Sequence, residues 1–165
     1  MVAYVPLYCC NTQVPDPFRP ENNPRNEFSD KSAFWVNNWV ANMIYPRYSM
    51  MIGDLREAQN ELEDYYFADQ DSVLQAIANL TPADRQSYLN QKSIAYADRM
   101  MQRWTRLAHH LIVRYNDQVV RPVENGQVIR GRYTTPGFDQ QFIDAIGPAT
   151  GNRYLLKKVI DRRER

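Results

Sequence analysis

The stretch "SAFWVNNWVANMIYPRYSMM", residues 32–51, carries a helix start, a proline and more large apolar groups than one helix face can bury. Ser32, or Asp30 just before it, supplies the side-chain oxygen that an N-cap needs. At about 100° per residue, the apolar side chains that follow form a stripe about 140° wide, which is the width of a core-facing surface. Its members are Val36, Val40, Met43, Met51, Leu55, Ala58, Leu62 and Tyr66. The stripe predicts a helix that packs on a neighbouring helix.

Pro46 lies inside this apolar pattern. A proline ring displaces the carbonyl group four residues back and donates no backbone hydrogen bond. We therefore expect the helix to kink, or to divide, after Tyr45.

Two further helices are predicted downstream. The segment "DQDSVLQAIANL", residues 69–80, has the pattern of a second, shorter helix. The next residues, "TPAD", are typical of a helix start, with Thr81 as the cap, Pro82 at the first helical position and Asp84 in the first turn.

The third helix carries an apolar seam whose members recur at alternating spacings of four and three residues. They are Ala97, Met101, Trp104, Ala108, Leu111 and Tyr115. If unbroken to Asn116, this helix is about 50 Å long. Such a seam favours an antiparallel partner, so the first and third helices should pair, with Trp104 buried between them.

The flanking segments are mixed in character. "VAYVPLYC", residues 2–9, reads as a short strand, and four prolines make residues 11–30 an irregular connection. "VENGQVIRGRY", residues 123–133, predicts a tight turn at Asn125 and Gly126 between two β-prone runs. A short helix is expected from Phe138 to Ile146. It should stop at Gly147 and Pro148.

The predicted fold class is therefore mainly α. A long antiparallel helical hairpin or bundle carries a short N-terminal strand and a small mixed C-terminal tail. We treat residues 1–165 as a single helical region, with a strand and proline-rich connection over 1–31, a helical core over 32–117 and a mixed tail over 118–165.

Charge and hydropathy exclude some partners. The chain has 20 Lys and Arg against 19 Asp and Glu, a formal net charge of +1, with no long block of either sign. This balance argues against nucleic acid as a partner, and no apolar run reaches the roughly 20 residues that span a bilayer. We expect neither nucleic-acid nor membrane binding.

No catalytic, cofactor-binding or metal-binding residue is predicted. Cys9 and Cys10 are adjacent and far in sequence from the only histidines, so they are interpreted as structural thiols. His109 and His110 lack a further ligand at metal-site spacing, and solvent-facing or helix-end roles are expected for them. An acidic group is expected to be a solvated face rather than a cation site: Glu61, Glu63, Asp64, Asp69 and Asp71.

Three aromatic residues of the opening stretch fall outside the stripe. Trp35 and Trp39 lie to one side of it and Phe34 to the other, so no single neighbouring helix can cover all three. Exposed aromatic patches on proteins usually mark a contact surface. Phe34, Trp35 and Trp39 are therefore candidate inter-domain or subunit contacts.

The run "SAFWVNNWVANMIYPRYSMMIGDLREAQNELE" resembles the C-terminal part of cysteine dipeptidases of the dipeptidase A type, relatives of the secernins. "YVPLYCCNTQVPDPFRP" before it and "HLIVRYNDQVV" after it are similar to that family in the same order. The resemblance implies a parent enzyme of the N-terminal-nucleophile hydrolase superfamily, with an αββα fold. It also implies a processed N-terminal Cys as nucleophile, with its own α-amino group as base.

This sequence departs from the family at the nucleophile, because its first residue is Met and no segment near it is similar to the nucleophile region. The resemblance therefore implies a C-terminal piece of a dipeptide hydrolase that is inactive alone. Its expected partners are the missing N-terminal catalytic half, a second copy in a homo-oligomer, and a small peptide as substrate of the parent. A free-standing helical interaction or oligomerisation module is the alternative, because a helical seam fits both.

Overall fold

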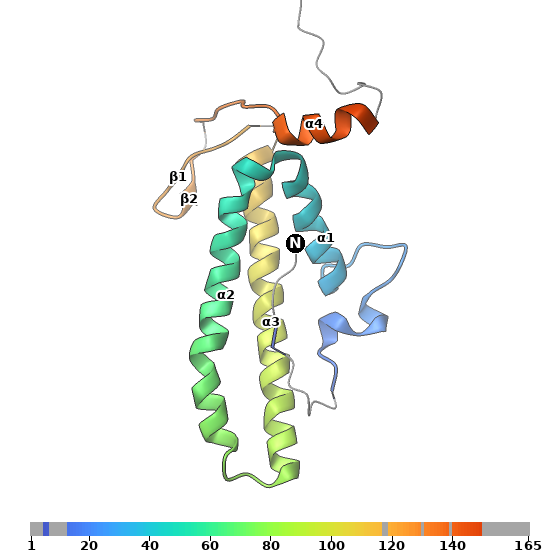
Figure 1. Ribbon diagram of the computed structural model, residues 1–165, viewed down its shortest axis with the longest axis vertical. Helices are drawn as coiled ribbons and strands as arrows, with labels where there is room; N and C mark the ends of the chain where they lie inside the picture. The colour runs from blue at the N-terminus through green and yellow to red at the C-terminus, as the bar shows by residue number, and fades with distance from the viewer. Residues whose placement is uncertain (1–4, 7–12, 117–118, 130, 139, 150–165) are drawn as a thin grey trace, which may run out of the picture.

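The computed structural model describes residues 5–6, 13–116, 119–129, 131–138 and 140–149. Two long antiparallel helices, α2 (Tyr48–Ile77) and α3 (Pro82–Tyr115), form a hairpin, and the shorter α1 (Ala33–Ile44) lies beside its upper half (Figure 1). The helix α4 (Gln140–Ala149) crosses the end of the hairpin where α3 finishes. The mainly α fold class is confirmed.

The start of α1 and the break at Pro46 are as predicted. The Ser32 hydroxyl accepts a hydrogen bond from the Trp35 backbone amide at 3.1 Å and donates a short one to the Asn23 side chain. At the other end a single 3₁₀ turn, η3 (Tyr45–Arg47), separates α1 from α2. The proline thus divides the apolar stripe between two helices, which both face α3.

The separate helix predicted over residues 69–80 is wrong. Residues 69–77 of this segment belong to α2, which continues without a break to Ile77. The apolar stripe does not end at Tyr66 but continues to Val73, which is buried on the same face. Because neither proline nor glycine occurs between Asp54 and Leu80, nothing in the backbone stops the helix.

The predicted start of α3 is confirmed in detail. The Thr81 hydroxyl accepts a hydrogen bond from the Asp84 amide at 3.2 Å, and it donates one to the Asp84 carboxylate at 2.7 Å. Pro82 occupies the first turn, where no intrahelical bond is lost. The helix ends at Tyr115, one residue short of the expected limit.

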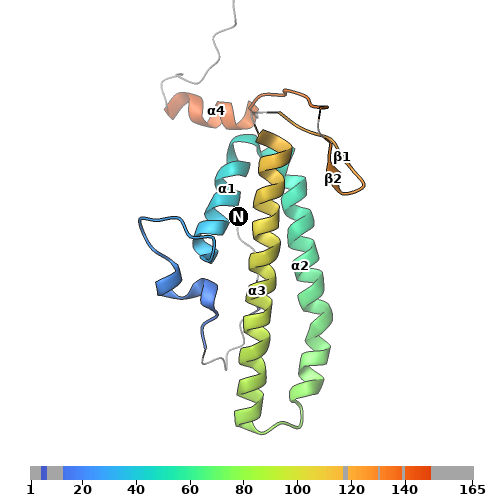
Figure 2. The same cartoon turned by 180° about the vertical axis from the view of Figure 1, so that it is seen from behind.

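The core lies along α3, which contacts both α1 and α2 (Figure 2). All six seam residues are buried, and Trp104 is fully enclosed. On the facing helices the stripe is buried as well, except for Met43, which is half-buried against the same core. The predicted pairing of the first and third helices is therefore confirmed.

The tail contains the predicted turn. The strands β1 (Val123–Glu124) and β2 (Gln127–Val128) pair antiparallel, and Asn125 and Gly126 between them have φ angles of 51° and 75°. Both positive φ angles fit the tight hairpin turn.

The α4 helix differs from its predicted limits, since it spans Gln140–Ala149 and includes Gly147 and Pro148. A proline in the last turn of a helix removes only one hydrogen bond, so the helix does not have to stop before it.

The N-terminal segment is irregular where it is described. Two 3₁₀ turns, η1 (Asp16–Phe18) and η2 (Pro20–Asn22), interrupt the proline-rich connection, and η1 contacts both α1 and α3. Most of the predicted strand, together with Cys9 and Cys10, lies outside the described residues.

Candidate functional site

Residues 45–48 carry much of the family resemblance. They include a buried arginine, Arg47. The Arg47 side chain donates hydrogen bonds from Nη1 to the Tyr115 carbonyl at 3.1 Å and to the Val119 carbonyl at 3.4 Å. Carbonyl groups in the last turn of a helix have no intrahelical partner, and a cation is stabilised there by the helix dipole. Arg47 therefore ties the break between α1 and α2 to the end of α3.

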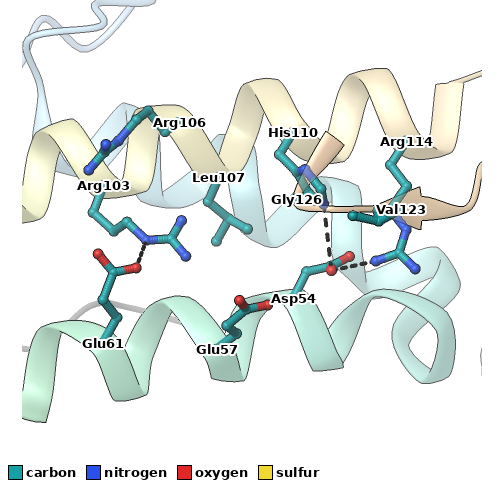
Figure 3. A pocket seen from close by; sticks show the side chains of 10 residues that line it. All are labelled: Asp54, Glu57, Glu61, Arg103, Arg106, Leu107, His110, Arg114, Val123 and Gly126. Carbon is teal, nitrogen blue, oxygen red and sulfur yellow. Dashed lines mark hydrogen bonds and ion pairs between the residues drawn. The ribbon is translucent and has the colours of Figure 1, made fainter. Parts of the chain in front are cut away.

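A polar cluster lies next to this contact, between α2 and α3. Asp54 of α2 accepts hydrogen bonds from Arg114 at 2.5 Å and from the Tyr115 hydroxyl at 2.7 Å, and His110 Nε2 lies 3.6 Å from the same carboxylate. Figure 3 shows His110 and Arg114 converging on Asp54. The Tyr115 hydroxyl also contacts the Met50 carbonyl, at 2.8 Å.

The cluster fixes the charge state of its carboxylate. Burial raises the pKa of Asp54, but hydrogen bonding by His110 and Tyr115 and the charge of Arg114 outweigh it, so the pKa lies below its ordinary value. Burial, together with the hydrogen bond to Asp54, raises the pKa of Tyr115. Asp54 is thus ionised and Tyr115 protonated at neutral pH. This arrangement holds helices together and does not generate a nucleophile.

A groove extends from this cluster along the α2–α3 interface. It has a volume of about 420 Å³, and Val123 and Gly126 of the β1–β2 hairpin line it near His110 and Arg114 (Figure 3). Its polar and charged lining residues are Asp54, Glu57, Glu61, Arg103, Arg106, His110 and Arg114. Glu61 and Arg103 form an ion pair across the groove, with Arg103 Nε at 2.5 Å from the carboxylate.

A second polar cluster lies farther along the hairpin. Asp69 accepts hydrogen bonds at 2.7 Å from Lys92 and from the Tyr96 hydroxyl, which lower its pKa. The neighbouring Tyr66 hydroxyl donates to the Tyr96 carbonyl at 3.0 Å, and burial raises the pKa of Tyr66 to about 12. The expected solvated acidic face is therefore wrong for Asp69, which is partly shielded beside Lys92, whereas Glu61 is exposed as expected although it pairs with Arg103.

Of the two histidines, His109 is exposed, as expected, whereas His110 is only partly exposed. Neither occupies the last turn of α3, which ends at Tyr115. His110 faces Asp54, and the His109 ring packs against Trp39 with the ring centroids 5.8 Å apart. The described residues contain no group of three or more side chains placed to hold a metal ion.

The three predicted contact aromatics have different surroundings. Phe34 is 59% exposed, whereas Trp35 and Trp39 are half-buried. Phe28 of the proline-rich connection packs against both indole rings, and Trp35 Nε1 donates a hydrogen bond to the Pro24 carbonyl at 2.7 Å. The chain thus covers part of this surface itself. The role of these residues in contacts beyond the chain stays a prediction.

Sequence reasoning missed Arg47 and the Asp54 cluster. For Arg47 a signal existed, because a lone cation directly after Pro46 falls at a helix break, where it can reach the end of another helix. For Asp54 no such signal existed. His110 and Arg114 are far from it in sequence, and only the register of α2 against α3 brings the three side chains together. Periodicity within one helix does not contain that register.

The described residues form a helical hairpin that packs against a third helix, and clusters of polar side chains join these helices. Residues 1–61 match the family model of peptidase family C69, so the resemblance found in the sequence is confirmed over this part of the chain. No curated protein and no solved structure matches the chain significantly. Within the described residues, none of the helices has the length and apolar character that a membrane span requires.

Proposed function

We propose that this chain is the helical C-terminal part of a cysteine dipeptidase. In this proposal the parent hydrolyses dipeptides by acyl transfer to the thiolate of an N-terminal Cys that is absent from this sequence. The chain braces the catalytic half or the subunit contacts. Its proposed partners are that half, a second copy of the chain and, for the complete enzyme, a small peptide.

The observation that carries the proposal is the match of residues 1–61 to peptidase family C69. The matched part includes all of α1 and the segment Tyr45–Tyr48, whose arginine ties α1, α2 and α3 together. The matched sequence is therefore joined to the rest of the chain by its core.

A free-standing interaction module remains the second candidate. One observation favours it: among the described residues, the buried apolar side chains of α1, α2 and α3 form a single core cluster. A chain that closes its own core can fold without a catalytic half.

The test compares the chain with a longer version. If the reading frame upstream of Met1 encodes a Cys that becomes a mature N-terminus, the longer protein should hydrolyse dipeptides, and its Cys→Ser variant should not. The chain of residues 1–165 should show no turnover on a panel of dipeptides at neutral pH.

Two results would contradict the proposal. One is an upstream frame without such a Cys. The other is hydrolysis by the chain alone that disappears in Cys9→Ser or Cys10→Ser, because these thiols are interpreted as structural.

A further inference from the structure

A groove beside α1, called here the α1 groove, combines aromatic rings with amide side chains. It is lined by Phe28, Trp35, Asn38, Trp39 and Asn42. Phe28 and Asn42 are exposed, and the other three are half-buried. None of the lining residues is charged, and residues 32–46 contain no Asp, Glu, Lys or Arg. A charged group in the groove would lose water without gaining an ionic partner, so the fitting ligand is uncharged where it touches α1.

The side chains that α1 contributes form two adjacent rows. Trp35 and Trp39 form the first row. Asn38 and Asn42 form the second, and in each row the members are four residues apart. Four residues of an α-helix rise by about 6 Å, and two residues of a polyproline II strand rise by nearly the same length, at about 3.1 Å each. The rows therefore repeat along α1 at the spacing of alternate residues in a polyproline II segment.

The α1 groove also presents hydrogen-bond donors that are not in use. Within the described part of the chain, the Asn38 and Asn42 amides and the Trp39 indole N–H make no hydrogen bond. A polyproline II segment has no internal hydrogen bonds, and proline itself has no N–H, so the carbonyl groups of such a segment need outside donors. The free donors of the groove match these acceptors.

The proline-rich connection of this chain already makes one contact of this kind on the same face of α1. Trp35 Nε1 donates a hydrogen bond to the Pro24 carbonyl at 2.7 Å. The Phe28 ring packs against both indoles. The Trp39 indole lies one helical turn farther along α1, next to this contact, and is placed to repeat it with a second segment.

From this geometry we infer that the α1 groove binds a proline-rich segment of a partner protein in the polyproline II conformation. Proline rings of the partner pack on Phe28 and Trp39, as in other aromatic grooves that recognise this conformation. The Trp39 indole and the two asparagine amides donate hydrogen bonds to its carbonyls. This inference goes beyond the proposed function and does not depend on it, because it is tested by binding and the dipeptidase proposal by hydrolysis.

The test adds a hexaproline peptide, blocked at both ends, to the isotope-labelled chain and follows the indole N–H signals of the three tryptophans by NMR. The Trp39 signal should move at millimolar peptide concentration. The Trp35 signal should move less, because its N–H stays bonded to Pro24, and the signal of the fully buried Trp104 should not move. A blocked Gly-Ser hexapeptide, which is flexible and lacks proline, should leave all three signals unchanged.

A variant identifies the groups that are responsible. The double change Asn38→Ala and Asn42→Ala should weaken hexaproline binding by about fivefold or more, because two hydrogen bonds are lost. Asn60→Ala removes an exposed asparagine of α2 that lies outside the groove lining, so it is the matched control and should bind as the wild type does. An unchanged Trp104 signal shows that each variant is folded.

Four outcomes would overturn the inference. The first three are a Trp39 signal that does not move with hexaproline, equal movement with the Gly-Ser peptide, and a double variant that binds as strongly as Asn60→Ala. The fourth concerns copies of the chain that associate through the α1 groove, which hexaproline should separate. Copies that stay associated through the groove in its presence would assign this groove to a second copy of the chain.

Discussion

The environment of Arg47 explains the amino-acid composition of residues 45–48. Arg47 is 4% exposed, and its guanidinium contacts the carbonyls of Tyr115 and Val119. The segment therefore has a structural reason for its composition. Proline breaks the helix, and the arginine fills the break with a cation directed at the end of α3.

Replacing Arg47 by Met should destabilise the fold by about 2–4 kcal/mol, because the α3 carbonyls would then be buried without their donor. Urea unfolding of the wild type and the variant measures this difference. Arg56→Met is the control, since Arg56 is exposed and its side chain donates a hydrogen bond to the exposed neighbour Gln59, at 3.0 Å, within the same helix. It should change stability by no more than about 0.5 kcal/mol. Similar effects for the two variants would contradict the assigned role of Arg47.

Asp54 gives the fold a dependence on pH. Its folded-state pKa lies below the value in an unfolded chain, so the unfolded state binds the proton more readily. The stabilisation is fully present above the unfolded pKa of about 4. It is lost as the pH falls through the lower folded-state pKa.

The stability difference between the wild type and Asp54→Asn should therefore be larger at neutral pH than in acid. Unfolding of both proteins in urea at neutral pH and near pH 3 measures it. Asp69→Asn should behave similarly, because hydrogen bonds lower the pKa of Asp69 as well. Asp71 is exposed on the same helix, so Asp71→Asn is a suitable control. A difference that does not change with pH would contradict this account of Asp54.

Among the helices and turns, the sequence correctly predicted the features that depend on local signals. Ser32 and Thr81 marked two helix starts, Pro46 marked the break, and Asn125–Gly126 marked the turn. Each of these signals acts through its own backbone or the next few residues. The sequence alone therefore suffices to find them.

The errors have a different origin. The false boundary in α2 came from a cluster of acidic and amide residues around Asp69–Ser72, which resembles a helix start. In the structure Asp69 instead pairs with Lys92 of α3, and the helix continues. The ion pairs of the groove were missed for the same reason, because they depend on the register between two helices.

The continuity of α2 can be tested by a proline at its far end. Asp71→Pro should cost about 3 kcal/mol, since residue 71 lies inside the helix and a proline there removes a backbone hydrogen bond and clashes with the preceding turn. Asp71→Ala, at the same exposed position, should have little effect. Urea unfolding of the two variants measures the contrast. A tolerated proline would restore the predicted helix boundary near residue 69.

For the whole molecule, the open question is what meets the aromatic surface on α1. Phe34 is largely exposed, and Trp35 and Trp39 are only half covered by the connection that contains Phe28. An apolar groove lies beside the two indoles and is lined by Phe28, Trp35, Asn38, Trp39 and Asn42. Exposed patches of this kind tend to drive association.

We therefore expect the isolated chain to self-associate through this end of α1. Sedimentation over a concentration series should show a mass that rises with concentration. Association should weaken when Trp35 and Trp39 are both made polar, and Phe34→Ser should weaken it without disturbing the Trp35 contact to Pro24. Phe67→Ser, an exposed aromatic on α2, is the control. A monomeric wild type would mean that the connection already covers enough of the surface.

The continuity of α2 also decides how the molecule can be dissected. The segment shared with peptidase family C69 ends at residue 61, in the middle of a helix that runs to Ile77. Truncation at that point would sever the helix and remove all of α3, whose side chains form one wall of the core. The border of detectable similarity is therefore not a border between folding units, and an excised segment of residues 1–61 would leave its apolar stripe without a partner.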